Sequence, residues 1–309
     1  MITIFHKTIK DSGLKRVKEP KIGSWIYVTN PTEEDMGRLE SEFRLEDGLV
    51  QDALDFYEVP RLETKDGIIY IFTRFPYEMP DEIVTMPALI AVGADFVITV
   101  CRVELPFMGA IKAQAKSGEF MFSTTQKTRL TVQLLTHVHE EYHRFLIKIR
   151  REVRRAQTSL EKITNRTIVD LVKHESTLND FLSALQPMNA ILQSLLAGRI
   201  MRLYEDDSEL IEDVYLSNGQ LGESCRSKLK SIMHVRNAYS TIMTNNLNQT
   251  MRFLTIVTVV LTIPTIVASL FGMNVPIPLG TNPYAFTGIV LFAILIPLIL
   301  LIAVTKSRF

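Results

Sequence analysis

Residues 253–274 read FLTIVTVVLTIPTIVASLFGMN, and this stretch decides how the rest of the chain is interpreted. Its first 19 residues, 253–271, carry no charged side chain, and a second uncharged run of 20 residues follows at 285–304. At about 1.5 Å of rise per residue, each run forms a helix of about 28–30 Å, close to the ~30 Å hydrocarbon core of a bilayer. Two helices buried in a soluble core are the alternative, but two consecutive runs of this length argue against it. We predict two membrane-spanning helices.

Charge is divided sharply along the chain. All 34 acidic residues lie at or before Glu223, and the 86 residues after it contain seven bases and no acid. Arg252 adjoins the first run, and Lys306 and Arg308 follow the second, whereas the loop 272–284 is uncharged. Because Lys and Arg concentrate on the cytoplasmic side of membrane proteins, we expect both termini in the cytoplasm and the loop outside.

The N-terminal segment indicates where the large polar part resides. Residues 1–7 read MITIFHK, which lacks the apolar core of a signal peptide. Cys101 and Cys225 are too few for a disulfide framework, so we expect reduced cysteines that serve as packing residues. The prediction is a cytoplasmic domain attached to the plasma (inner) membrane as a multi-pass protein.

Residues 1–125 alternate short β-like runs with short helices. Thr32 followed by three acids is a helix start, with a capping hydroxyl and carboxylates in the first turn. Two apolar runs around Gly93-Ala94-Asp95 predict a β-hairpin. We expect an α/β domain with strands at 22–28, 68–75, 88–92 and 96–100.

Long helices follow this domain. Residues 126–204 predict a helical hairpin, from a 3.6-residue apolar stripe over 128–165 and a second helix over 167–196 that Pro187 disturbs. Residues 205–252 form a stalk that continues into the first span as one helix of about 50 to 60 residues, and 305–309 form a basic tail. The fold class is therefore an α+β cytoplasmic domain, a long stalk helix and two C-terminal transmembrane helices.

The hydroxyl residues of the first span share one helix face. They are spaced by 3, 4, 3 and 4 residues, and they are Thr255, Thr258, Thr262, Thr265 and Ser269. A hydroxyl that bonds back to its own helix would explain why each residue is tolerated, but not why all five share one face. A contact between helices that is mediated by hydroxyls would also produce a stripe. A water-filled axis surrounded by several copies explains the stripe better, and it requires a symmetric oligomer of parallel helices.

The same spacing extends toward the cytoplasm through Met251 and Asn248. With Leu254, Met251 would present apolar rings to the axis at the inner end. Such rings can close a pore by dewetting, and they are equally consistent with ordinary packing between helices.

No carboxylate lies in either span or in the loop between them. A pore of hydroxyls and amides suits an ion that keeps its shell of hydration water. Asn274 would accept hydrogen bonds from that water at the outer mouth, Gly272 would permit close backbone approach, and Met273 would orient the loop. A plain helix C-cap is the alternative for this tripeptide.

The tripeptide Gly272-Met273-Asn274 between the last two spans resembles the signature of the CorA family of divalent-cation channels. Two further segments resemble that family, NQTMRFLT at 248–255 and Asp-Val-Tyr at 213–215, and the resemblance covers the whole chain. It implies a homopentamer that carries Mg²⁺ inward passively, with Co²⁺ and Ni²⁺ as secondary ions. It implies no organic cofactor, no nucleic-acid partner and no enzyme activity. A Gly-rich phosphate loop followed by Lys-Ser/Thr is also absent from the sequence.

The resemblance also implies a regulatory metal site. Asp213 would help to form a divalent-cation site between neighbouring cytoplasmic domains, where bound Mg²⁺ favours the closed state. Its partner should be an acid of the α/β domain, with Asp81 preferred over Glu78 and Glu82. Carboxylates that bridge subunits repel without metal and are drawn together by it, although a solvated acidic surface is the alternative.

Some features depart from the family pattern or suggest other functions. The outer loop lacks acids found in many relatives, Asn237 replaces an acid of some relatives, and Pro264 lies one residue later. The zinc-transporting branch varies the middle of the tripeptide, so Met273 favours Mg²⁺ over zinc or another transition metal.

His139-Glu140-Glu141-Tyr142-His143 matches the HExxH pattern of zinc proteases, with His137 nearby. A membrane-anchored metalloprotease is the alternative from another class, but the motif lies within a charged helix without a clear third ligand. We interpret it as a solvated helix face.

Overall fold

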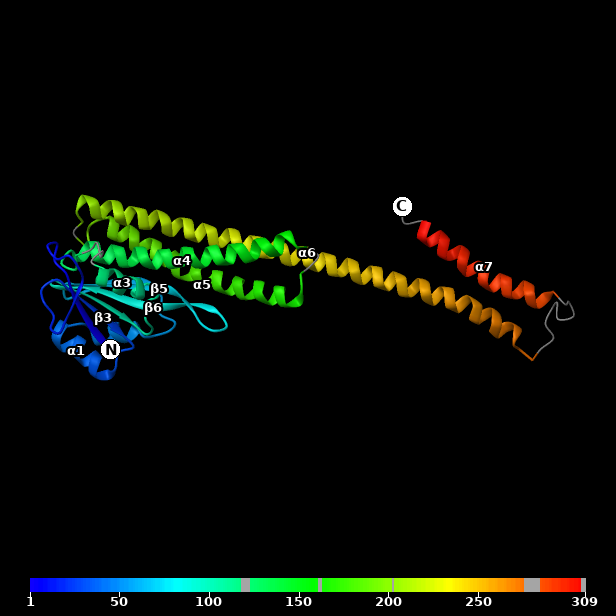
Figure 1. The fold of residues 1–309 in the computed structure, drawn as a ribbon, viewed down its shortest axis with the longest axis horizontal. Coiled ribbons are helices and arrows are strands. Elements are labelled where there is room, and N and C mark those ends of the chain that lie inside the picture. The colour runs from blue at the N-terminus through cyan, green and yellow to red at the C-terminus, as the bar shows by residue number, and fades with distance from the viewer. Residues whose placement is uncertain (118–122, 161–162, 202, 275–283, 307–309) are drawn as a thin grey trace. The chain divides into compact units, whose positions relative to one another are not determined.

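The computed structural model describes residues 1–117, 123–160, 163–201, 203–274 and 284–306 (Figure 1). The chain divides into two compact units, Met1–Arg236 and Asn237–Phe309, and each is described by itself. The elements follow in the order β1 (Ile2–His6), β2 (Lys15–Val17), β3 (Ser24–Thr29), α1 (Glu33–Phe43), α2 (Asp47–Asp52), β4 (Arg61–Lys65), β5 (Ile68–Glu78), β6 (Ile83–Val92), β7 (Phe96–Cys101), α3 (Met108–Ser117), α4 (Lys127–Thr158), α5 (Asn165–Leu196), α6 (Glu205–Phe271) and α7 (Ala285–Lys306).

The first unit is built on one seven-stranded sheet with the strand order β2-β1-β3-β7-β6-β5-β4. The β3–β7 pair is parallel, and every other neighbouring pair is antiparallel. The predicted hairpin is confirmed as β6 and β7. A Cβ atom at Gly93 would lie 2.4 Å from the Phe96 ring, so a larger residue at this position would have to displace that ring.

Both faces of the sheet are covered by helices. Along β3, Trp25 and Tyr27 point into the core shared with α4 and α5, whereas Ile26 and Val28 point into the core under α1 and α2. This two-residue alternation of two apolar sets is expected for a strand that is buried on both sides. Figure 1 shows α1 on one side of the sheet and α4 and α5 on the other.

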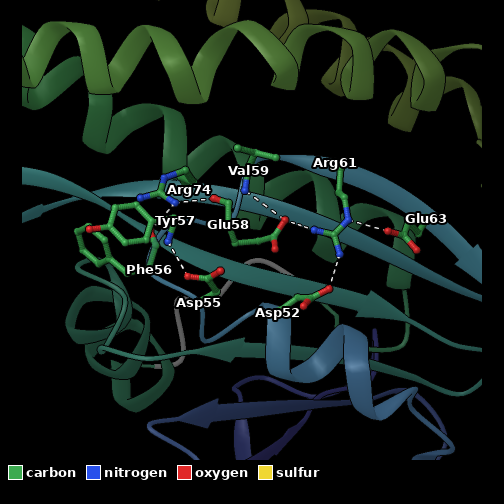
Figure 2. A network of polar contacts seen from close by, with 9 residues as sticks. All are labelled: Asp52, Asp55, Phe56, Tyr57, Glu58, Val59, Arg61, Glu63 and Arg74. Atoms are coloured by element: carbon green, nitrogen blue, oxygen red, sulfur yellow. Dashed lines mark hydrogen bonds and ion pairs between the residues drawn. The ribbon is translucent and has the colours of Figure 1, made fainter.

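Two arginines hold the chain between α2 and β4 against the sheet (Figure 2). Arg61 forms ion pairs with three carboxylates, and its guanidinium lies 3.9 Å from the centre of the Phe72 ring. Arg74 donates to two carbonyls of the loop and to Thr85. The partners of Arg61 are Asp52, Glu58 and Glu63, and the two loop carbonyls belong to Phe56 and Glu58. This loop is therefore fixed by charge-assisted bonds rather than by regular secondary structure.

The helical hairpin has different boundaries from those predicted. α4 ends at Thr158 rather than reaching residue 165, and α5 begins at Asn165 rather than at residue 167. The reason is Thr164, whose hydroxyl accepts a hydrogen bond from the Thr167 amide and caps α5. Pro187 lies inside α5 without ending it.

The predicted stalk and first span form one helix, α6, of 67 residues, which is longer than predicted. Gly219, Gly222 and Pro264 all lie inside it. Its apolar part is long enough to cross a membrane, and none of that part is buried. In α7, the described apolar stretch Phe286–Ile299 is shorter.

Candidate functional site

The hydroxyl stripe of the first span lies on an exposed face of α6. Thr255, Thr258, Thr262 and Thr265 each donate a hydrogen bond to the carbonyl four residues earlier, at 2.7–2.9 Å. The hydroxyls therefore do bond back to their own helix, and these bonds fix the direction in which each hydroxyl hydrogen points. A hydroxyl whose hydrogen is used within the helix has only its oxygen lone pairs left for other partners. The stripe, which Ser269 continues toward the outer end, is a row of hydrogen-bond acceptors.

The same face continues farther into the stalk than we predicted. Thr241 and Thr244 donate to the carbonyls of Asn237 and Ser240, at 3.0 and 2.9 Å, in the same manner. Asn237, Thr241, Thr244 and Asn248 maintain the spacing of four and three residues. The available signal was this periodicity, together with the absence of charge from 237 to 251. The prediction from the sequence ended this face at Asn248 and missed Asn237, Thr241 and Thr244.

Apolar side chains interrupt the polar face near Arg252. Met251 is 53% exposed and Leu254 is 57% exposed in the single chain. Their exposure leaves them available for contacts with other chains, as predicted for an apolar ring. The ring itself stays a prediction.

The tripeptide follows directly after α6. The Gly272 amide donates to the Ala268 carbonyl at 2.9 Å, and a Cβ at Gly272 would lie 3.2 Å from that same oxygen. The close approach expected of Gly272 is present, and its backbone is not left-handed, so a left-handed C-cap does not describe this residue. Met273 and Asn274 are exposed, and the outer loop from 275 to 283 lies outside the described residues.

The acids expected at the regulatory site lie on separate parts of the first unit. Asp213 is exposed on α6, beside a groove of about 350 Å³ between α6 and α4. Asp81 is exposed in the turn between β5 and β6, where its carbonyl accepts a hydrogen bond from Lys173 at 3.2 Å. Glu78 instead forms an ion pair with Lys148 at 2.5 Å. No described contact joins Asp213 to Asp81 within one chain, so their pairing stays a prediction about neighbouring copies.

The HExxH segment is only partly the solvated face that we expected, because Glu140 and His143 are exposed whereas His139 and Tyr142 are buried. His139 is only 4% exposed, because α6 packs over this part of α4. Its Nδ1 lies 2.7 Å from the Leu135 carbonyl, and its Nε2 lies 2.9 Å from Asn218 Oδ1 on α6. Burial lowers the pKa of His139 below its ordinary value, while the hydrogen bonds to Leu135 and Asn218 act in the opposite direction.

This geometry does not suit a catalytic zinc site. Both nitrogens of His139 already face protein oxygens, while His143 is exposed and Glu140 pairs with His137 at 2.8 Å. Within the part of the chain that the structure describes, no group of three His, Cys, Asp or Glu side chains is placed to hold a metal. The motif is thus explained by the packing of α4 against α6.

A long apolar helix with a face of hydrogen-bond acceptors is typical of a membrane protein that moves a polar solute or ion. Comparison with known proteins identifies the family. The chain belongs to the family of CorA-like Mg²⁺ transporter proteins, whose family model matches residues 21–306. This family consists of membrane transporters, and the predicted resemblance is confirmed.

Individual relatives are distant but cover most of the chain. The cobalt/magnesium transport protein CorA of Methanocaldococcus jannaschii is 23% identical over 297 residues, which is 92% of this chain and 90% of that protein. The putative metal ion transporter YfjQ of Bacillus subtilis is 22% identical over 275 residues, 88% of this chain and 85% of that protein.

The complete structure of the CorA magnesium transporter from M. jannaschii superimposes with a TM-score of 0.86 at 18% identity. It covers 100% of this chain and 98% of that one. The fold class is confirmed by this match.

Proposed function

We propose that this chain forms a homopentameric channel through which Mg²⁺ enters the cell passively, with Co²⁺ and Ni²⁺ as weaker substrates. Membership of the Mg²⁺ transporter family supports the substrate. In the proposed topology, both termini are cytoplasmic and residues 272–284 face outward, as the positions of Arg252, Lys306 and Arg308 favour. One α6 helix cannot enclose a pore, so several copies must surround the axis.

The acceptor stripe is the observation that carries this proposal. A hydrated Mg²⁺ presents the hydrogens of its first-shell water outward and releases that water reluctantly. Hydroxyl oxygens whose own hydrogens are used within the helix can accept those water hydrogens. The stripe would therefore guide the ion with its hydration shell intact, and no side-chain carboxylate would have to bind the metal directly.

The two ends of the stripe would have different roles. A ring of Asn274 carboxamides at the outer mouth would accept hydrogen bonds from the hydration water and select the ion by the size of its shell. Rings of Met251 and Leu254 at the inner end would exclude water when the helices approach one another. Entry would then be selective, and closure would need no plug.

Regulation would depend on carboxylates that face each other between copies. In the proposed site, Asp213 of one copy and Asp81 of its neighbour share a cation. Asp213 is exposed on α6, the same helix that continues into the first span. Loss of the metal would leave like charges close together, and their repulsion would open the interface.

Flux into proteoliposomes tests the transport proposal. Purified full-length protein is reconstituted, and Mg²⁺ entry is followed with an internal indicator while Co²⁺, Ni²⁺ or Zn²⁺ competes outside. We expect Asn274→Ala to reduce entry to near background, whereas Asn246→Ala on the opposite face of α6 retains it. Wild-type flux in Asn274→Ala, or Zn²⁺ flux in preference to Mg²⁺, would contradict the proposal.

The same vesicles test regulation. With Mg²⁺ inside at a concentration that closes the wild type, Asp213→Asn should remain open. The matched control is Glu212→Gln, which removes the neighbouring exposed acid and should close normally. Identical Mg²⁺ sensitivity of Asp213→Asn and the wild type would remove Asp213 from the sensor.

A further inference from the structure

A large cleft of the first unit lies apart from all the residues discussed above as channel or sensor. Its volume is about 910 Å³. It is bounded by the turns after β4 and β6, by the first turn of α4, and by the segment that leads into α6. Pockets for small organic ligands typically measure about 300–1,000 Å³. The cleft is therefore large enough for a ligand of nucleotide size.

One wall of the cleft carries a buried carboxylate without a partner. Asp207 is 5% exposed and lines the cleft from the first turn of α6. Among the residues that the structure describes, its carboxylate forms no hydrogen bond or ion pair. Its oxygens are accessible from the cleft, so the carboxylate can meet a cation there. Asp206 and Glu205 line the same wall.

The lining of the cleft also carries positive charge at a helix N-terminus. The first turn of α4 contains Lys127 and Arg129 and no acid, and Gln126 provides no side-chain cap. Basic side chains at an N-terminus oppose the helix dipole, whereas phosphate groups at that position are favoured by it. α1 and α5 each begin with a capping threonine, whereas α2 and α4 begin without a side-chain cap.

Most donors of Arg129 remain available in this wall. The nearest carboxylate that it faces is Asp206, at 3.9 Å, and Asp206 is itself largely exposed. Lys127 Nζ donates to the Gly93 and Ala94 carbonyls, which fixes the ammonium at the edge of the cleft. The lining of the cleft thus contains both carboxylates and cationic donors, together with four apolar residues: Ile69, Val92, Ile200 and Met201.

We propose that this cleft binds Mg²⁺ complexed with a nucleoside polyphosphate. Mg²⁺ is commonly held by one or two carboxylates together with phosphate oxygens and water, which fits Asp207 and requires no cluster of three protein ligands. The phosphates would lie against Arg129 and the start of α4, and the apolar residues would contact the nucleoside. The proposal concerns binding and involves no hydrolysis.

Occupancy of this cleft would act at the beginning of α6, whose other end is the first membrane span. A ligand there would change gating only if it binds the open and closed states with different affinity. This regulatory consequence rests on the proposed channel function, whereas the binding itself does not. The two are therefore tested separately.

Equilibrium binding of radiolabelled ATP to the purified full-length chain in detergent tests the proposal, with and without Mg²⁺. We expect saturable binding of MgATP that weakens when the metal is chelated. Arg129→Met should weaken binding about 10- to 100-fold, as expected for loss of a charged hydrogen-bond donor. Asp207→Asn should reduce MgATP affinity to that of metal-free ATP.

Matched controls are Arg144→Met, farther along α4, and Glu212→Gln, at an exposed position farther along α6, and both should bind MgATP as the wild type does. Asp207→Asn should unfold at the wild-type temperature or above it without ligand, because it removes an unpaired buried charge. Absence of saturable MgATP binding, or unchanged affinity in both cleft variants, would overturn the proposal. Equal affinity for magnesium tripolyphosphate would overturn the nucleoside assignment. None of these results bears on Mg²⁺ flux through wild-type proteoliposomes, which tests the channel independently.

Discussion

The two halves of α6 have opposite surface patterns. From Glu205 to Arg236 the helix is polar with a buried stripe that faces the rest of the first unit, and its buried residues are Asp207, Ile211, Val214, Asn218, Leu221, Gly222, Cys225, Ile232 and Val235. From Asn237 to Phe271 no residue is buried in the single chain. The membrane part of this second half is apolar and carries a hydroxyl stripe.

This difference shows what the side chains of each half of α6 pack against. The first half buries its stripe against its own chain, and this burial supplies the hydrophobic stabilisation. The second half satisfies its backbone within the helix, as a membrane span must, and leaves its apolar surface for lipid. Its hydroxyls donate only to their own helix, and among the described residues no donor meets their oxygens, so water, ions or other copies are left to do so.

Truncation of a buried side chain in the first half should have the largest effect on stability. Ile232 is 0% exposed, so Ile232→Ala should lower the free energy of unfolding by about 2–5 kcal/mol. Met233→Ala, at an exposed neighbour, should change it by less than about 0.5 kcal/mol. Fluorescence of Trp25, the single tryptophan and a fully buried core residue, reports unfolding of this unit. Equal losses in the two variants would contradict the assigned faces.

Removal of the hydroxyls should affect the second half in function rather than in stability. The triple variant Thr258→Val, Thr262→Val, Thr265→Val keeps the shape of the helix while it deletes the acceptors. We expect Mg²⁺ flux to fall about 100-fold, which corresponds to about 2.7 kcal/mol in barrier height. The control Val260→Thr with Val267→Thr adds hydroxyls to the opposite face and should conduct. Normal flux in the triple variant would mean that the stripe does not face the ion.

A smaller effect is expected from pH on the first half. Because burial holds the pKa of His139 below that of the unfolded chain, near 6.5, the unfolded state takes up a proton that the folded state excludes. The free energy of unfolding should therefore fall as pH drops below about 6.5, by at most about 1.4 kcal/mol per pH unit. His139→Gln should flatten this slope between pH 7 and 5, and His143→Gln, at an exposed site, should not. An unchanged slope in His139→Gln would show that another group is responsible.

Much of the fold could be predicted because its signals are local. The hairpin follows from two apolar runs around Gly93, and the stalk follows from a long segment without a strong breaker. β1, β2 and β4 were missed, because a strand such as Lys15–Val17 has too few apolar residues to show periodicity. The parallel β3–β7 pairing was also inaccessible, since it joins segments that lie about 70 residues apart.

The candidate site likewise has features that could be predicted from the sequence and features that could not. The hydroxyl stripe could be predicted because periodicity on one helix needs no knowledge of neighbours. Burial of His139 could not, because it depends on which face of α6 packs against α4. The unpartnered state of Asp207 likewise depends on three-dimensional packing, which brings segments 67–69, 92–94, 125–129 and 200–207 around one cleft.

Cysteine scanning of residues 253–271 in the reconstituted protein tests the central claim most directly. The native thiols give little background, because burial raises the pKa of Cys101 to about 11 and that of Cys225 to about 12. The account predicts that a water-soluble thiol reagent modifies cysteines at 255, 258, 262, 265 and 269 and spares those at 256, 260, 263 and 267. Uniform modification, or modification of the opposite face, would contradict a water-filled axis lined by the hydroxyl stripe.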